Sequence, residues 1–379
     1  MESDLATGRL WRNWLLHVKL EFLTWNKTDR VIGSVGSSSF LEIVQRSQAK
    51  RLHNMSSSLE QSYRELKEGL GFCVLNARTT IELKGADRAQ FLHNFCTNDV
   101  LGLTPGGGCE AFITNAQGKI VAYVLIFCEA DSIILESDAD QAESILTHLD
   151  RYLIREDVVL TDRSEEMRQI YLGSGTWHQA LSSPGTVEIR HQPMSHTRYD
   201  FGHRTVCLRN ITGTSLPVFQ ISCLAEIQNQ VVGSLQELGA RPCSVDAVEI
   251  IRVEAGVPIY GADITDENLP QELGREDSTI SFTKGCYLGQ ETIARIDALG
   301  HVNWLFKGIR FLNDVSAQPG TELMVDGTRM GRVTSSIYSP FLNSAFSLGY
   351  VRREHGATGT RITTSAGPLE ILNLPLVDG

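Results

Sequence analysis

The segment Lys284-Gly-Cys-Tyr-Leu-Gly-Gln-Glu291 carries the clearest chemical pattern of the chain. Two glycines bracket Cys286, and they allow the backbone to turn and to leave the thiol at an exposed bend. Lys284 and Arg295 place positive charge nearby, which favours the nucleophilic thiolate over the thiol. The alternative is a buried structural cysteine with solvated charges around it, which is the commoner role of a single cysteine.

A second segment, Arg252-Val-Glu-Ala-Gly-Val-Pro258 followed by Gly261-Ala-Asp263, places Glu254 in the last turn of a predicted helix. The helix macrodipole disfavours a carboxylate there by ~0.3–1 kcal/mol, which indicates a specific partner. A carboxylate matches a planar fork of N–H donors, such as a guanidinium group or the amino-pyrimidine edge of a pterin. A salt bridge with Arg252 or another neighbour is the alternative.

The third segment is Thr97-Asn-Asp-Val100, with Asn115 and Gly118 in the turns that follow. At the end of a helix, Asp99 is typical of an Asx-type cap, in which the side chain accepts a backbone N–H. The alternative is that Asp99 meets a ligand amine as an acid–base or electrostatic partner.

An α+β region is predicted to position these segments. Strands are predicted at 72–75, 79–83, 110–115, 119–128 and 132–136, the third and fourth forming a hairpin. Asp87 is a suitable N-cap for a helix that buries Phe91, Leu92 and Phe95. Further helices are predicted from about residue 140, at 224–238 and at 244–255, the last two ending at Gly239 and Gly256.

The predicted secondary structure changes to short strands after a loop-rich stretch at residues 256–303. Six short strands are predicted at 306–312, 322–325, 329–337, 346–351, 360–364 and 369–372. Closely spaced strands with frequent turn signals favour a small barrel. A domain boundary is therefore expected near 301–305.

Composition narrows the functional classes. The chain has 379 residues, with 34 Lys and Arg against 45 Asp and Glu, and its net charge of −11 argues against a nucleic-acid binder. No window approaches ~18 uncharged apolar residues, so no membrane span is expected. The eight cysteines include no Cys-x-x-Cys pair, which argues against a zinc or iron–sulfur centre held by this chain. Most of them are expected to be buried, with Cys128 as a core candidate.

Residues 1–54 differ from the rest. They hold eight basic and five acidic residues, a net charge of +3, which leaves −14 for the remainder. They lack the apolar core and cleavage site of a secretory signal. We expect this stretch to be either a disordered extension or not translated, with Met55 as the true start.

In this order, the three segments resemble the family of the glycine-cleavage T-protein (aminomethyltransferase). The Lys284–Glu291 motif resembles, within that family, the folate-binding YgfZ group linked to iron–sulfur cluster assembly and repair. The likeness covers about residues 70–375. It implies an α+β fold of three lobes in a ring: two folate-binding lobes, at about 70–165 and 166–302, and a C-terminal β-barrel at 303–379.

The resemblance also implies tetrahydrofolate in a central channel. Glu254 would hold the pterin edge, Asp99 would lie near the folate nitrogens, and Cys286 would line the channel as the residue that the group needs for its iron–sulfur role. Arg252, Lys284 and Arg295 would meet the folate glutamate tail or the thiolate. The likeness places three further residues at the cofactor, namely Asn115, Tyr287 and Gln290.

Two departures from the T-protein bear on the reaction. The T-protein carries an acidic pair after its glycine turn, where this chain has Lys119-Ile-Val-Ala-Tyr123, and it has a basic residue where this chain has Gln290. We therefore expect a tetrahydrofolate-binding accessory factor for iron–sulfur clusters, a monomer that meets client or assembly proteins in the cytoplasm or in an organelle. The alternatives are a folate-dependent aminomethyl or one-carbon transferase and a folate-binding module without catalysis.

Overall fold

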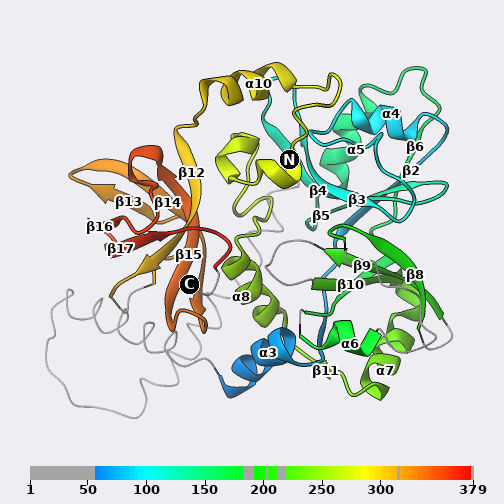
Figure 1. The fold of residues 1–379 in the computed structure, drawn as a ribbon, viewed down its shortest axis with the longest axis horizontal. Helices are drawn as coiled ribbons and strands as arrows, with labels where there is room; N and C mark the ends of the chain where they lie inside the picture. The colour runs from blue at the N-terminus through cyan, green and yellow to red at the C-terminus, as the bar shows by residue number, and fades with distance from the viewer. Residues whose placement is uncertain are drawn as a thin grey trace, which may run out of the picture. The chain divides into compact units, whose positions relative to one another are not determined.

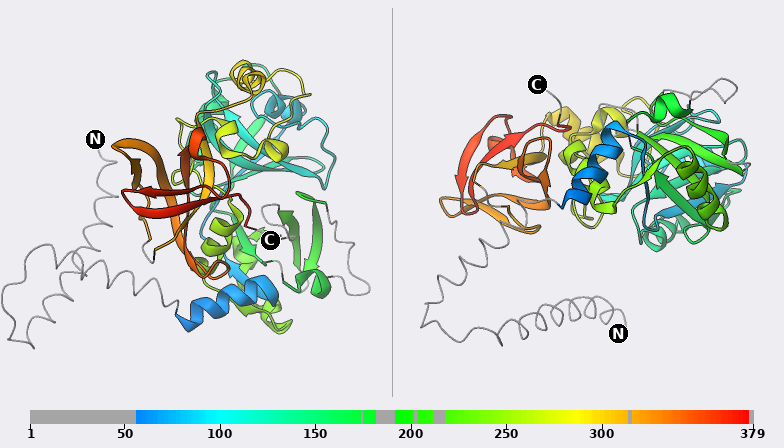
Figure 2. Two further views of the ribbon diagram at one scale, coloured as in Figure 1. Left: turned by 60° about the vertical axis from the view of Figure 1, so that its left-hand side comes forward. Right: turned by 90° about the horizontal axis from the view of Figure 1, so that it is seen from below.

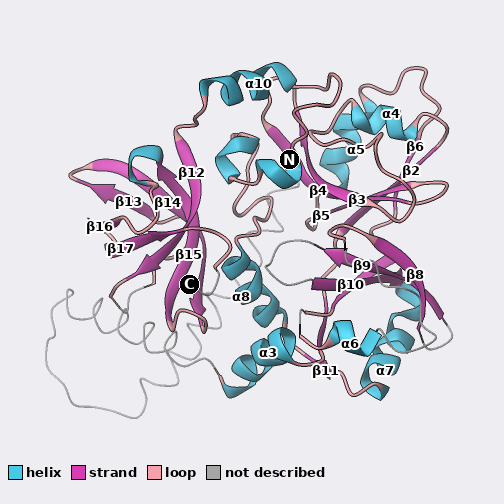
Figure 3. Ribbon diagram, viewed as in Figure 1, coloured by secondary structure: helices cyan, strands magenta, loops and turns pink. Residues whose placement is uncertain are grey.

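The computed structural model describes residues 56–173, 175–181, 192–201, 204–211, 218–313 and 316–376. The expectation for residues 1–54 lies outside these ranges. The described residues form three β-sheets with helices packed against them (Figures 1 and 3). None of the described helices is long and apolar enough to cross a membrane.

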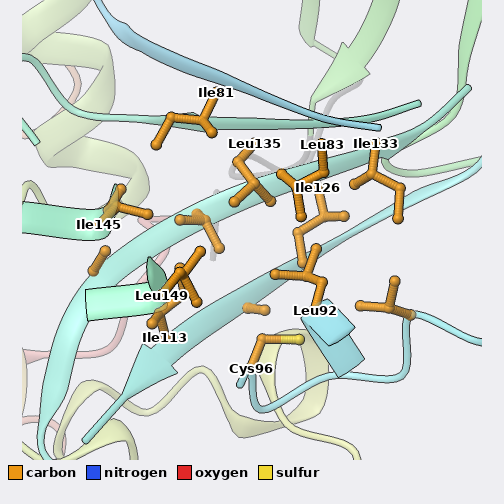
Figure 4. Packing of buried hydrophobic residues seen from close by; sticks show 14 of the residues in the cluster. Ile81, Leu83, Leu92, Cys96, Ile113, Ile126, Ile133, Leu135, Ile145 and Leu149 are labelled. Atoms are coloured by element: carbon orange, nitrogen blue, oxygen red, sulfur yellow. The ribbon is translucent and has the colours of Figure 1, made fainter. Parts of the chain in front are cut away.

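The first lobe is a five-stranded antiparallel sheet covered by two helices, α4 (Arg88–His93) and α5 (Ala142–Asp150). Its strands, in sheet order, are β3 (Gly108–Thr114), β4 (Ile120–Cys128), β5 (Ile133–Ser137), β2 (Thr79–Lys84) and β6 (Val159–Asp162). Ile81, Ile126 and Leu135 from the strands meet Leu92 and Ile145 from the helices in a buried core (Figure 4). The predicted hairpin is confirmed as β3–β4.

The second lobe is a six-stranded sheet whose strands come from distant parts of the chain. In sheet order they are β11 (Arg241–Pro242), β1 (Gly71–Val74), β7 (Met167–Tyr171), β10 (Val218–Leu224), β9 (Arg204–Ile211) and β8 (His196–Phe201). The strand β1 precedes the whole first lobe in the chain, yet it pairs with β7 and β11 here. Helices α6 (Trp177–Leu181) and α7 (Gln228–Glu237) bury Trp177 and Leu235 against this sheet.

Helix α8 (Val245–Ala255) lies between the second lobe and the barrel (Figure 1). Its bounds confirm the prediction, because Ser244 caps the Ala247 N–H at 3.3 Å and Gly256 ends the helix with a φ of 68°. Ala247 and Ile250 pack beside helix α3 (Ser57–Glu68) and the second sheet, whereas Val253 joins a core shared with barrel strands. The helix thus has two buried faces.

The C-terminal strands form the predicted small barrel, seen from other directions in Figure 2. In sheet order they are β13 (Glu322–Val325), β14 (Thr328–Ser339), β15 (Ser344–Arg352), β12 (Trp304–Phe311), β17 (Gly367–Leu372) and β16 (Arg361–Thr364). The two edge strands come close enough for the Ser365 N–H to donate to the Met324 carbonyl at 2.9 Å. The barrel is therefore nearly closed.

Three sequence expectations fail locally. The stretch 256–303, expected to be rich in loops, contains helix α10 (Gln290–Leu299), in which Ile293 is the buried residue. Asp87 does not cap α4, because its carboxylate instead accepts the Asp157 N–H at 2.8 Å. Cys128 lies at the end of β4 and is only partly buried.

The buried thiols predict how stability depends on alkaline pH. Burial raises the pKa of Cys73, Cys96, Cys223 and Cys243 from 9.0 to about 11. Between pH 9 and 11 the unfolded chain therefore loses thiol protons that the folded protein keeps. The contribution of these protonated thiols to the free energy of unfolding is fully present below pH 9 and is lost as the pH rises from 9 to 11.

We expect the free energy of unfolding, measured with urea, to be lower at about pH 10.5 than at about pH 8. The slope of this free energy against pH gives the number of protons that unfolding releases, and we expect Cys73→Ala to reduce that number by up to about one. Cys286→Ala is the matched control, because Cys286 is the exposed cysteine. Equal slopes for wild type and Cys73→Ala would contradict the prediction.

Candidate functional site

The first and third sequence motifs meet at the end of α4, where Lys284 is buried. Its Nζ donates to the carbonyl oxygens of His93 at 2.6 Å and of Cys96 and Asn98 at 2.7 Å. An ammonium group has three N–H donors, so all of them are used. Burial lowers the pKa of Lys284. In the structure its charge holds backbone in place, and its contact with the folate tail or a thiolate stays a prediction.

The same motif packs closely on the β3–β4 turn. The Thr114 hydroxyl donates to the Leu288 carbonyl at 2.7 Å, and a Cβ on Gly289 would lie 2.5 Å from the Asn115 carbonyl oxygen. Asn115 shapes the turn itself, since its Oδ1 accepts the N–H groups of Gln117 at 2.9 Å and Lys119 at 3.0 Å. The structure gives Asn115 a turn-forming role and places it away from the cavity described below.

Cys286 is the exposed member of the eight cysteines, all of which the structure describes. It is not among the residues that line the central cavity described below, and its place in a folate channel stays a prediction. Tyr287 is buried beside Ile280 and Ile293, with Lys284 Nζ 4.9 Å from its ring centre, and burial raises its pKa to about 12.

Gln290 and Arg295 belong to α10, and Arg295 is exposed there. Neither they nor Tyr287 are among the residues that line the central cavity. The predicted contacts of these three residues with folate therefore have no counterpart in this cavity.

Asp99 confirms the Asx interpretation, because its Oδ1 accepts the Gly102 N–H at 3.1 Å. The same oxygen lies 3.3 Å from His93 Nδ1, at an angle that makes no hydrogen bond, and the Asp99 side chain is 46% exposed. Burial lowers the pKa of His93, which keeps the imidazole neutral at pH 7. Asp99 lies outside the central cavity, so its predicted place near the folate nitrogens is not supported there.

The central cavity has a volume of about 340 Å³ and is lined by both α+β lobes and α8. The first lobe contributes Tyr123 from β4, Glu136 from β5, and Asp138 and Ala139 directly after β5. The second lobe contributes Tyr171 and Gln220, and α8 contributes a wall that includes Val248 and Ile251. The cavity therefore combines aromatic and apolar walls with a few polar groups, as small-molecule sites do.

Two carboxylates of β5 and its end, Glu136 and Asp138, face this cavity and were not identified from the sequence. Glu136 accepts hydrogen bonds from Arg78 Nε at 3.1 Å, from Gln220 Nε2 at 2.8 Å and from the buried Arg209 guanidinium. Asp138 Oδ2 accepts the Tyr260 N–H at 2.7 Å, and burial raises the pKa of Asp138. The sequence did offer one signal for Glu136, since it is an acidic residue that follows three apolar residues in a predicted strand.

Arg252 is the one predicted site residue that lines the cavity, but it has no N–H left for a ligand. Its Nε and one Nη2 hydrogen bind the Glu249 carboxylate at 2.8 and 2.6 Å. The other N–H groups donate to Asp263 Oδ2 at 2.8 Å, to the Val257 carbonyl at 2.6 Å and to Ser335 Oγ at 2.9 Å. These bonds use all five donors of the guanidinium group, so its contact with the folate tail stays a prediction that this geometry does not support.

Glu254 is likewise used within the fold. Its Oε2 accepts the Tyr63 hydroxyl at 2.7 Å, and its Oε1 accepts the Ser339 hydroxyl at 2.6 Å and the Phe341 N–H at 3.4 Å. Lys67 Nζ lies 3.8 Å from Oε2. The carboxylate ties α3 and the barrel to α8 and does not line the cavity, and its contact with a pterin edge stays a prediction without support from this geometry.

Removing the Glu254 carboxylate should therefore destabilise the protein. We expect Glu254→Ala to lower the free energy of unfolding by about 3 kcal/mol, because Tyr63 and Ser339 lose their buried acceptor. Urea denaturation measures the change, with Glu68→Ala on the exposed side of α3 as control. A variant as stable as wild type would show that these hydrogen bonds contribute little.

Lys284→Met tests the other buried charge. Three backbone carbonyls lose their donor, and we expect the free energy of unfolding to fall by about 2–4 kcal/mol. Hydrogen exchange should speed up in α4 and the turn after it, which Lys284 holds. Exchange rates that change equally across the barrel would argue against this local role.

The described residues contain no group of three or more His, Cys, Asp or Glu side chains able to hold a metal ion.

Two family models match the chain. The GCVT N-terminal domain matches residues 37–284, which is more than half of the chain and begins upstream of Met55. The glycine cleavage T-protein C-terminal barrel domain matches residues 308–378. The second match coincides with the six barrel strands.

Curated relatives agree with these models. A chloroplastic protein of Arabidopsis thaliana named "Putative transferase" is 26% identical over 285 residues, covering 75% of this chain and 65% of that protein. The chain thus spans just under two thirds of the length of this relative. The aminomethyltransferase of Synechocystis sp. is 24% identical over 319 residues, covering 81% of this chain and 84% of the enzyme. That of Halalkalibacterium halodurans is 23% identical over 321 residues, covering 81% and 85%.

A solved structure has the same fold. The glycine cleavage system aminomethyltransferase T of Bartonella henselae superimposes with a TM-score of 0.74 at 17% identity, covering 84% of this chain and 89% of that one. At this identity the likeness concerns the fold alone. With its two α+β lobes, its barrel and the two family matches, this chain belongs to the glycine-cleavage T-protein family.

Proposed function

We propose that this protein binds tetrahydrofolate in the central cavity and acts as an accessory factor in the assembly or repair of iron–sulfur clusters. The observation that carries the first part is the cavity of about 340 Å³, where both α+β lobes and α8 meet. Family membership supports the same ligand class, because the relatives that match most of the chain are named aminomethyltransferases.

The residues of the cavity fit a pterin ring. A pterin is flat and apolar on its faces and has N–H donors on one edge. Tyr123 and Tyr171 supply aromatic surface, and Val248 and Ile251 supply an apolar wall. Glu136 and Asp138 supply acceptors on the wall formed by β5. This combination of apolar walls and few, well-placed polar groups is suited to holding and orienting such a ligand.

When bound, tetrahydrofolate supplies nitrogens that carry one-carbon units. The chain's own part in the cavity is to exclude water with its apolar walls and to orient the ring with fixed polar groups. Arg78 helps to fix the two carboxylates in position, because it donates to Glu136 at 3.1 Å and lies 3.5 Å from Asp138 Oδ1.

The iron–sulfur part of the proposal rests on Cys286. Its thiol is exposed, and the loop that carries it is fixed at one end by the buried Lys284 ammonium and at the other by the close contact of Gly289 with the β3–β4 turn. An exposed thiol on a fixed loop is suited to meeting a protein partner. Ligand binding in the cavity and thiol chemistry at Cys286 would then take place at separate positions of the molecule.

Aminomethyl transfer is the second candidate function, and the names of the bacterial relatives favour it. Against it, the Lys119–Tyr123 stretch and Gln290 depart from the T-protein pattern. Production of methylenetetrahydrofolate from an aminomethyl-lipoyl carrier, measured with purified protein, would establish this activity and overturn the accessory role.

Cys286→Ala tests the proposal. Because Cys286 is exposed and outside the cavity, we expect the variant to fold and to bind tetrahydrofolate like wild type. We also expect it to fail to restore iron–sulfur enzyme activity in a strain that lacks this protein. Calorimetry measures the binding, and assays of iron–sulfur enzymes measure the rescue.

Cys243→Ala is the control, since it removes a partly buried thiol from the other lobe. Full rescue by Cys286→Ala would exclude a role for this thiol and leave a folate-binding module. Loss of tetrahydrofolate binding in Cys286→Ala would contradict the separation of the two positions.

A further inference from the structure

Three carboxylates line the central cavity, and their hydrogen bonds distinguish them. Glu249 is engaged through both oxygens by the Arg252 guanidinium, at 2.8 and 2.6 Å. Glu136 accepts from Arg78, from Gln220 and from the buried Arg209. Both groups are therefore committed to the protein's own cations.

Asp138 differs from the other two. Its Oδ2 accepts one backbone N–H, from Tyr260 at 2.7 Å, and its Oδ1 lies 3.5 Å from the nearest Arg78 nitrogen, at the limit of a hydrogen bond. A carboxylate can accept about four hydrogen bonds, so Asp138 keeps acceptor capacity on both oxygens. Its side chain is 12% exposed, and Asp138 is one of the residues that line the cavity.

We propose that Asp138 is the carboxylate that recognises the ligand of this cavity, by accepting two parallel N–H bonds from a 2-amino-4-oxopteridine edge. This inference rests on the proposed function, and it assigns to Asp138 the role that the family resemblance suggested for Glu254, which does not line this cavity. The pairing is charge-assisted and bidentate, which gives it both strength and geometric specificity.

The surroundings of Asp138 agree with this assignment. Arg78 and Arg252 are the cations that act on it, and Asp263 is the nearby anion. Arg252 is fully engaged by Glu249, Asp263 and Ser335, so it does not compete for the carboxylate of Asp138. Burial of this carboxylate makes a ligand N–H donor more favourable than it would be in water.

Calorimetry with tetrahydrofolate, under anaerobic conditions, compares wild type with Asp138→Asn and with Asp140→Asn. In Asp138→Asn the new side-chain amide oxygen can still accept the Tyr260 N–H, so the fold keeps its internal bond. Asp140 is exposed two residues further on, and its φ of 61° suits asparagine, so it is a matched control. We expect Asp138→Asn to weaken binding by about ten- to a hundredfold and Asp140→Asn to leave it unchanged.

A second measurement on wild type needs no variant. Pterin presents an amine at position 2, whereas 2,4-dioxopteridine presents a carbonyl oxygen, which would face the carboxylate. We expect the dioxo compound to bind at least about tenfold more weakly.

The outcomes separate the two proposals. If wild type binds tetrahydrofolate and Asp138→Asn binds equally well, the assignment of Asp138 is overturned and the folate site stands. If wild type does not bind tetrahydrofolate, the proposed function and the assignment both fail. If Asp138→Asn does not fold, the two pteridines decide, and equal affinities for them overturn the assignment.

Discussion

A charge that leaves water must receive its hydrogen-bond partners from the protein, and this requirement governs the polar residues of the fold. Lys284 donates its three N–H groups to three carbonyls, and Arg252 donates its five N–H groups to neighbouring acceptors. Glu254 is satisfied by groups from α3 and the barrel. Three of the residues that the sequence motifs singled out therefore serve the fold: Lys284 holds the turn after α4, and Arg252 and Glu254 connect α8 to the barrel.

Helix α8 shows what this arrangement achieves. One side packs with α3 and the second sheet, another packs into the core shared with the barrel, and a third forms a wall of the cavity. The Glu254 carboxylate and the Arg252 guanidinium fix the helix on its two neighbours. One wall of the cavity is therefore a helix that is bonded to both of its neighbours, and small-molecule sites are usually preformed in this way.

Local signals in the sequence were reliable where the structure depends on local interactions. Helix 244–255 has its Ser244 cap and its Gly256 stop, and each of the six barrel strands lies within a few residues of its expected place. Long-range partners could not be predicted in this way. Nothing next to Glu254 in the chain indicates that Tyr63, 191 residues away, would take its carboxylate. The free acceptor on Asp138 is defined only after Arg78, Gln220 and Arg252 have found their partners.

The path of the chain through the second lobe has a consequence for synthesis on the ribosome. All strands of the first sheet lie between Thr79 and Asp162, so this sheet can complete itself as soon as that stretch has emerged. Strand β1 emerges earlier, but both of its neighbours, β7 and β11, are made later. Both edges of β1 therefore stay unpaired while about 90 further residues are synthesised before β7. Chaperones bind nascent chains whose strand edges are exposed in this way.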